Sequence, residues 1–181
     1  MKVIGGTAKG RKISVPKGVC LRATTDRTKE SLFNILPAPE GKAFLDLFAG
    51  TGNVGIEAMS RGAARTVFIE KNAVMAGVIK KNVSVCGLDG DYEVIATPCE
   101  RGIRILAQRR ESFDIIFADP PYERGYVEKT LYWLGRNSLL SVNGVIVIEH
   151  SDKEPCGDDS IFALKDQRKY GDTIISFWKM K

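Results

Sequence analysis

The segment LDLFAGTGNVGIEA, residues 45–58, decides the fold of this 181-residue chain. It starts as an apolar run and then passes through Gly50, Gly52 and Gly55, which are spaced as G-x-G-x-x-G. Glycines at this spacing let the chain turn tightly after a strand and let a ligand approach the backbone. The segment therefore predicts a buried strand, a nucleotide-binding loop and a helix, in that order.

The alternation of strands and helices continues along the chain. Short apolar runs predict five buried strands, at 43–48, 66–70, 92–96, 113–118 and 144–150. Helical spacing predicts helices between them, at 53–61, 72–86, about 99–110 and 126–137. Such alternation is typical of a parallel sheet covered on both faces. Two last strands, 160–169 and 173–179, are joined by so short a link that they must be antiparallel. We expect an α/β fold with three α/β/α layers, Rossmann-like, around a seven-stranded, mostly parallel sheet with an antiparallel C-terminal strand.

The N-terminal part follows another pattern. Residues 1–4 and 11–15 are short β-prone runs on either side of the glycine-rich GGTAKG, which predicts a β-hairpin with a mobile tip. N-cap residue types and an apolar stripe then predict a helix that ends before Pro37. We expect residues 1–40 to form a hairpin-and-helix extension and residues 41–181 to form the main domain, within one compact unit.

The net charge of +5 is concentrated in the extension. Residues 1–30 contain eight lysines and arginines and two acidic residues, so they carry +6 and the other 151 residues carry −1. A basic segment on a near-neutral body fits a surface that binds a polyanion such as nucleic acid. A solvated basic tail would have the same composition, so both interpretations stay open at this point.

Several classes of protein and site are disfavoured by the composition. No apolar run approaches the roughly 20 residues of a membrane helix, and the N-terminus lacks the apolar stretch of a secretory signal. The chain has four cysteines without a C-x-x-C spacing and a single histidine, so we expect no metal site. Scattered free thiols fit a reducing compartment. We expect a cytoplasmic monomer that does not bind membranes.

Two acidic residues beside the glycine loop narrow the choice of ligand. Glu70 ends the second predicted strand 20 residues after Gly50, where a carboxylate can accept hydrogen bonds from ribose hydroxyls. Asp46 lies within the first strand, where a carboxylate suits a cationic sulfonium ligand and its amino group better than a pyrophosphate. The pattern favours S-adenosylmethionine, and a nicotinamide dinucleotide is the alternative.

A second motif points to the reaction. In FDIIFADPPY, residues 113–122, an apolar strand runs directly into Asp119, Pro120, Pro121 and Tyr122. The two prolines stiffen the turn and leave its carbonyl groups able to accept hydrogen bonds. A planar base could stack on Tyr122, which is worth about 1–3 kcal/mol, while Asp119 and the Pro120 carbonyl hold the hydrogens of its exocyclic amine. Holding the amine nitrogen about 3–3.5 Å from the methyl carbon and in line would supply much of the rate acceleration.

Taken together, these segments resemble a known family. IGGTAKGRKI (4–13) and RATTDRTKESLFNIL (22–36) closely resemble the bacterial 16S ribosomal RNA guanine-N2 methyltransferases that modify guanine 966. These enzymes are class I S-adenosylmethionine-dependent methyltransferases. The resemblance covers essentially the whole chain, including YGDT (170–173). The glycine loop and the Asp-Pro-Pro-Tyr motif occur in many amino-methyltransferases, whereas the two N-terminal segments are more specific.

The resemblance implies a class I methyltransferase fold and assigns roles to individual residues. Catalysis and base contacts fall to Asp119, Pro120, Pro121 and Tyr122. Cofactor contacts are expected at Asp46, Ala49, Gly50, Thr51, Gly52, Glu70, Lys71, Pro98, Cys99 and Asp119. RNA contacts are expected at Lys2, Lys9, Arg11, Lys12, Arg22, Thr25 and Arg27. The chain departs from the family at Pro98 and Cys99, where many relatives carry an acidic or amide residue that meets the adenine amine.

The leading hypothesis is therefore methyl transfer to a guanine N2 amine in 16S ribosomal RNA, within an assembled or partly assembled small ribosomal subunit. The target base would be flipped out of its stack. One alternative is a DNA adenine or cytosine amino-methyltransferase, although 181 residues leave no separate DNA-recognition domain. The others are a non-catalytic RNA-binding assembly factor and a nicotinamide-dependent oxidoreductase.

Overall fold

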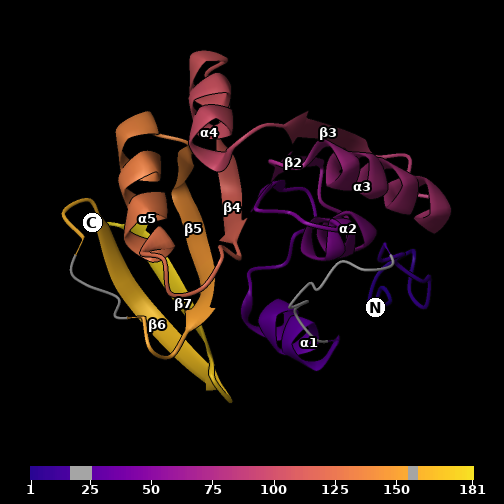
Figure 1. Cartoon of the computed structure of the whole chain (residues 1–181), viewed down its shortest axis with the longest axis horizontal. Coiled ribbons are helices and arrows are strands. Elements are labelled where there is room, and N and C mark those ends of the chain that lie inside the picture. Colours follow the sequence, from indigo (N-terminus) through magenta and orange to yellow (C-terminus); the bar gives the residue numbers. More distant parts are fainter. Residues whose placement is uncertain (17–25, 155–158) are drawn as a thin grey trace.

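A seven-stranded sheet forms the centre of the computed structural model, which describes residues 1–16, 26–154 and 159–181 (Figure 1). The strands are β1 (Ala43–Leu47), β2 (Arg65–Glu70), β3 (Asp91–Ala96), β4 (Phe113–Ala118), β5 (Leu140–Ser151), β6 (Phe162–Tyr170) and β7 (Thr173–Met180). Their order in the sheet is β3-β2-β1-β4-β5-β7-β6. The first five are parallel, and β7 runs antiparallel to both β5 and β6. The predicted sheet, with its antiparallel C-terminal strand, is confirmed.

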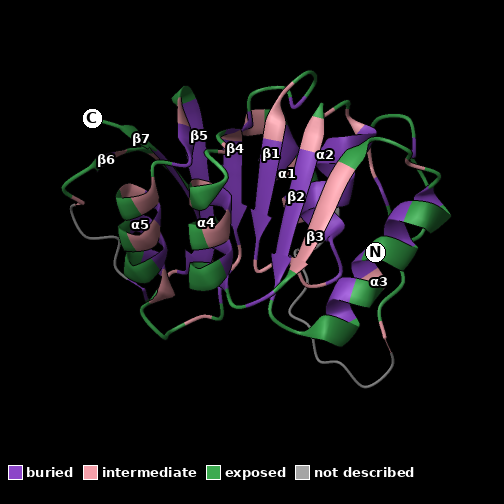
Figure 2. Cartoon of the chain, turned by 90° about the horizontal axis from the view of Figure 1, so that it is seen from above, coloured by how far each residue is buried: buried purple, intermediate pink, exposed green. Residues whose placement is uncertain are grey.

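Helices cover both faces of the sheet, as Figure 2 shows. They are α1 (Asp26–Ile35), α2 (Asn53–Ser60), α3 (Ala73–Cys86), α4 (Cys99–Gln108) and α5 (Tyr126–Asn137). Helices α4 and α5 pack on the face that carries Val67 and Ile69 of β2, while α2 and α3 pack on the face that carries Phe68. Helix α1 covers Phe44 and Phe117 on that second face. This is the predicted three-layer arrangement. None of the helices described is long and apolar enough to cross a membrane.

The central strands can be predicted from the sequence because both of their faces are buried. Leu45 and Leu47 of β1 enter one core cluster and Phe44 enters the other, so the strand reads as a continuous apolar run. β5 is longer than predicted, because its pairing with β4 starts at Leu140 and shifts register before it resumes at Val145. Because the residues within that shift include polar ones, the hydrophobicity pattern does not predict the first part of the strand.

The predicted hairpin is present in reduced form, and its tip is packed. A single antiparallel bridge joins Lys2 to Lys12, and the Val3 amide donates to the Arg11 carbonyl at 2.9 Å. Ala8, at the expected mobile tip, is only 3% exposed, and its amide donates to Ser60 Oγ at 2.9 Å. The prediction of a mobile tip is therefore wrong. Helix α2 supplies partners that the glycine-rich sequence does not reveal.

Gly6 shows how closely this loop approaches α2. Its φ of 73° lies in the left-handed region, and a Cβ added there would lie 1.7 Å from the Ser60 carbonyl oxygen. The Thr7 amide donates to the same oxygen at 2.8 Å. Gly6 thus permits a close contact between the N-terminal loop and the end of α2.

Candidate functional site

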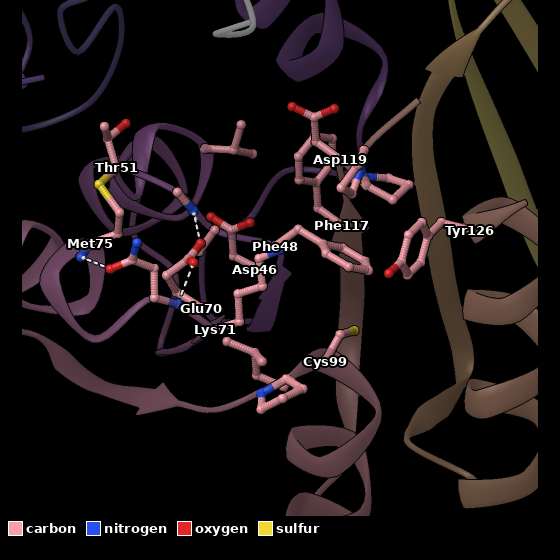
Figure 3. A pocket seen from close by; sticks show the side chains of 18 of the residues that line it. Asp46, Phe48, Thr51, Glu70, Lys71, Met75, Cys99, Phe117, Asp119 and Tyr126 are labelled. Atoms are coloured by element: carbon pink, nitrogen blue, oxygen red, sulfur yellow. Dashed lines mark hydrogen bonds between the residues drawn. The ribbon is translucent and has the colours of Figure 1, made fainter. Parts of the chain in front are cut away.

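The predicted site residues meet at the carboxyl edge of the parallel strands. A cavity of about 780 Å³ opens there, and its walls come from the segments that follow β1, β2, β3 and β4 (Figure 3). Such an edge is where ligands bind in open α/β sheets. The predicted residues that line it are Asp46, Ala49, Gly50, Thr51, Glu70, Lys71, Pro98, Cys99, Asp119, Pro120, Pro121 and Tyr122. Segments far apart in the sequence therefore form one site, as the two motifs predicted.

The glycine loop owes its shape to left-handed backbone positions. Gly50 and Gly52 have φ values of 56° and 78°, and Gly52 is the N-cap residue of α2. Gly52 is the one predicted cofactor residue that does not line the cavity. The third glycine serves packing, because a Cβ on Gly55 would lie 2.2 Å from the Phe68 ring. The spacing G-x-G-x-x-G thus combines two turn positions with one close approach of helix to strand.

Glu70 ties the ends of β1 and β2 together. One of its carboxylate oxygens accepts from the Gly50 amide at 2.9 Å, and the other accepts from the Asn72 amide at 2.8 Å. These hydrogen bonds are drawn in Figure 3. A carboxylate oxygen has two lone pairs, so each oxygen can accept a further donor. Glu70 is therefore held in place and still able to accept hydrogen bonds from a ligand, and its predicted contact with ribose hydroxyls stays a prediction.

Asp46 is a buried carboxyl group in the floor of the site. It is 2% exposed and accepts a hydrogen bond from the Gly55 amide at 2.9 Å. Burial raises the pKa of Asp46 to about 7; the Gly55 hydrogen bond opposes this shift and the nearby charge of Glu70 adds to it. A carboxyl group in such a place is stabilised in its charged form by a cation. The pair of carboxyl groups therefore favours a positively charged ligand over a phosphate.

The Asp-Pro-Pro-Tyr turn is held in place by contacts between Tyr122 and two neighbouring strands. Asp119 and Tyr122 are partly exposed at the cavity and Pro120 is buried. The Tyr122 hydroxyl donates to Glu149 Oε1 at 3.3 Å and lies 3.4 Å from Thr173 Oγ1. The sequence predicted only a role for the tyrosine ring. The structure adds a hydroxyl contact with β5 and β7, and this contact fixes where the ring lies.

The cavity also has an aromatic wall that was not predicted from the sequence. Phe48, Tyr126 and Trp133 all line the cavity. The rings of Phe48 and Tyr126 meet edge to face with centroids 5.6 Å apart, and those of Tyr126 and Trp133 with centroids 6.3 Å apart. Figure 3 shows Tyr126 and Asp119 on one side of the cavity and Glu70 and Met75 on the other. Phe48 ends the predicted first strand, and aromatic residues in a predicted helix such as 126–137 usually pack in a core, so only the position of Tyr126, four residues after Tyr122, hinted at this site.

Pro98 and Cys99 form an uncharged part of the wall where α4 begins. Pro98 is the N-cap residue of α4 and Cys99 is 7% exposed. Burial raises the pKa of the Cys99 thiol well above its usual range, so the thiol stays protonated. A neutral, apolar surface at this position fits the face or edge of an uncharged ring. Among the described residues no group of histidine, cysteine, aspartate or glutamate is arranged to hold a metal ion.

The basic residues of the N-terminal segment lie outside the cavity. Lys2, Lys9, Arg11 and Lys12 are all exposed. The segment that carries them packs on α2 and α3 through Val3, Ala8 and Ile13, and Met1 lines the cavity. Two other predicted RNA contacts, Arg22 and Thr25, lie outside the described residues, and so does the side chain of Arg27. The described cations thus project from a packed platform that begins at the rim of the cavity.

Comparison with known proteins agrees with this geometry. The model of a family described as conserved hypothetical protein 95 matches residues 1–179. The chain is 37% identical to the Ribosomal RNA small subunit methyltransferase D of Escherichia coli K12 over 150 residues, which are 82% of this chain and 74% of that protein. It is 32% identical to the protein of the same name from Haemophilus influenzae over 178 residues, 98% of this chain and 91% of that one. A solved structure of a hypothetical protein from Thermus thermophilus superimposes with a TM-score of 0.85 at 28% identity and covers 99% of both chains.

Proposed function

Because the chain belongs to the family described as conserved hypothetical protein 95, we propose that it is an S-adenosylmethionine-dependent ribosomal RNA methyltransferase. Its substrate is the exocyclic N2 amine of a guanine in 16S ribosomal RNA, with guanine 966 as the target that the sequence resemblance suggests. The observation that carries the proposal is the meeting of two motifs in one cavity. The carboxyl groups of Asp46 and Glu70 lie in the same cavity as the Asp-Pro-Pro-Tyr turn. The names of relatives at 32% and 37% identity support the choice of substrate.

The residues present fit S-adenosylmethionine. A cavity of about 780 Å³ lies within the usual range for small-molecule sites. Asp46 would face the positive charges of the ligand, Glu70 would accept hydrogen bonds from its ribose, and Pro98 and Cys99 would contact its adenine. When bound, this cofactor supplies a methyl group on a cationic sulfur that leaves readily. The protein must therefore mainly position the acceptor and keep water away from it.

The Asp-Pro-Pro-Tyr turn would perform that positioning. Stacking on the Tyr122 ring would hold the base flat, and Asp119 together with the Pro120 carbonyl would accept hydrogen bonds from its amine. These acceptors favour a pyramidal nitrogen, whose lone pair then points at the methyl carbon. As the new carbon–nitrogen bond forms and the carbon–sulfur bond breaks, the nitrogen becomes acidic and passes a proton to Asp119 or to water. No strong base is needed for this step.

The experiment that tests the proposal is mass spectrometry of small-subunit ribosomal RNA from cells with and without the gene. We expect loss of one N2-methylguanine when the gene is deleted and its return when purified protein and S-adenosylmethionine are added to the small subunits. Methyl transfer to plasmid DNA but not to subunits would favour a DNA methyltransferase. Unchanged ribosomal RNA together with binding of NADH and not of S-adenosylmethionine would favour the oxidoreductase.

Cofactor affinity should depend on pH through Asp46. The pKa of its carboxyl is about 7 in the free protein, so the group is mostly charged above that pH and mostly neutral below it. A cationic ligand prefers the charged form, and affinity should fall with decreasing pH below 7, by up to about tenfold per pH unit. Isothermal titration with S-adenosylmethionine between about pH 5.5 and about pH 8.5 measures this dependence. Asp46→Asn should bind more weakly and without the pH dependence; a parent protein with constant affinity across this range would contradict the assignment.

The exposed N-terminal cations should contribute to RNA affinity through phosphate contacts. Replacing Lys9, Arg11 and Lys12 by alanine should weaken binding to small subunits and make the dependence of log K on log salt shallower by about 2–3, since each phosphate contact contributes about 0.7–0.9. Affinity for S-adenosylhomocysteine should stay the same. A triple alanine variant at three other exposed lysines, Lys165, Lys179 and Lys181, is the matched control. An equal loss of RNA affinity in the control would show that net charge, and not this segment, is responsible.

A further inference from the structure

We infer that Lys29 is a positioning residue, which fixes the N-terminal basic segment, residues 1–14, against the helix that begins at the cofactor loop. The inference rests on the proposed function, because it concerns how that segment presents its cations to RNA. Lys29 belongs to α1 and is completely buried. A buried ammonium group is rare in proteins unless it has partners, so the contacts of this group indicate what it does.

The Lys29 ammonium contacts oxygen atoms from two other parts of the chain. Its Nζ donates to the Lys2 carbonyl at 2.8 Å and to Asn53 Oδ1 at 2.8 Å, and it lies 3.2 Å from Glu57 Oε2. An ammonium group has three N–H donors, so it can donate to each of these acceptors. One of the acceptors is in the basic segment and two are in α2. Lys29 therefore joins the segment to α2 directly.

Glu57 holds the same segment from the opposite side of the ion pair. Its carboxylate accepts from the Ile4 amide at 2.9 Å and from the Gly5 amide at 2.8 Å. It also pairs with Arg61 at 2.8 Å, and the Glu57 side chain is completely buried. Charge on this carboxylate strengthens its hydrogen bonds to the two amides. The Lys29 ammonium stabilises that charge in a place that water does not reach.

The position of this ion pair links it to the cavity. Asn53, which accepts from Lys29, is the first residue of α2 and lines the cavity. Met1 also lines the cavity, one residue before the Lys2 carbonyl that Lys29 binds. The ion pair therefore sets the distance between the first residues of the basic segment and the start of α2. Apolar side chains could fill the same volume, but they would not select one register for the backbone groups of Lys2, Ile4 and Gly5.

The test is the replacement of Lys29 by methionine, which keeps a long side chain and removes the charge. Without this ion pair the basic segment must be ordered when RNA binds, and that cost falls on affinity; we expect KM for small subunits to rise at least about tenfold. Turnover at saturating subunits and the Kd of S-adenosylhomocysteine should change by less than about threefold, because Lys29 touches neither reactant. The salt dependence of subunit binding should keep its slope, since a buried cation neutralises no phosphate. Hydrogen exchange at the amides of Ile4 and Gly5 should become faster.

Two further variants make the outcome decisive. Glu57→Gln removes the charge at nearly constant volume and should raise KM in the same way, which covers the case in which Lys29→Met does not fold. Arg65→Met breaks ion pairs with Asp91, Glu93 and Glu111 near the amino ends of the parallel strands, away from the cavity. This variant controls for a general loss of stability. An unchanged KM in the Lys29 or Glu57 variant, an equal rise in the Arg65 variant, or a shallower salt slope would each overturn the inference. If the parent protein does not methylate small subunits, the proposed function has failed, and the exchange rates of Ile4 and Gly5 still report whether Lys29 holds the segment.

Discussion

Replacing Asp119 by alanine should lower the turnover number for methyl transfer by about 10²–10³, the usual cost of removing one preorganised group that stabilises a transition state. Asp119 lines the cavity directly after β4, on the same edge of the sheet as Glu70 and the glycine loop. Its carboxylate would hold a hydrogen of the base amine and direct the nitrogen lone pair at the methyl carbon. Single-turnover assays with small subunits measure the effect on the chemical step alone.

Asp119→Asn is the matched control for this variant. Its amide oxygen can still accept a hydrogen bond from the amine, so we expect it to retain more activity than Asp119→Ala. The Kd of S-adenosylhomocysteine should change little in either variant, because we assign the main charged contacts with the cofactor to Asp46 and Glu70. If the alanine variant methylates small subunits at the parent rate, the protein would be better described as a non-catalytic assembly factor or as an enzyme with another active site.

Tyr122→Ala should produce the second large loss. Removing the ring removes a stacking surface worth about 1–3 kcal/mol, which corresponds to a decrease in kcat/KM of about fivefold to about 150-fold. Tyr122→Phe keeps the ring and loses the hydrogen bond to Glu149, and we expect it to cost about tenfold or less. Steady-state kinetics of both variants on small subunits separate the two contributions.

The structure explains why the phenylalanine variant should not be fully active. The Tyr122 hydroxyl is held between Glu149 of β5 and Thr173 of β7, so the ring loses one restraint when the hydroxyl is removed. Equal damage from Tyr122→Phe and Tyr122→Ala would show that the hydroxyl, and not stacking, has the main role. Thr173→Val, which removes only the weaker contact, should lie close to the parent.

The sheet and the glycine loop could be predicted from the sequence because they depend on local patterns. Both faces of β1 and β4 are buried, and their residues therefore form continuous apolar runs. Asp46 stands out within such a run, because a carboxyl group in a buried strand needs a specific reason. The residues of the Asp-Pro-Pro-Tyr turn could be placed for a related reason: the carboxyl ends of parallel strands share one edge.

What could not be predicted depends on contacts between distant segments. The N-terminal loop looks mobile because of its glycines, yet Glu57 and Ser60 hold it, and they lie more than fifty residues away. The aromatic wall of Phe48, Tyr126 and Trp133 forms only when α5 packs beside the glycine loop. Hydrophobic periodicity cannot distinguish an aromatic residue that lines a cavity from one that fills a core, so these residues were missed.

The place of β7 in the sheet determines which part of the site can form last during translation. β7 lies between β5 and β6, although it is the strand synthesised after both of them. A nascent chain that has emerged only as far as β6 still lacks the neighbour of β5 and also lacks Thr173, which lies beside the Tyr122 hydroxyl. The glycine loop and its carboxyl groups can form before β7 is made, whereas the turn that we propose receives the base gains its contact with Thr173 only when β7 enters the sheet. Ability to bind the methyl donor should therefore arise during translation before the ability to use it.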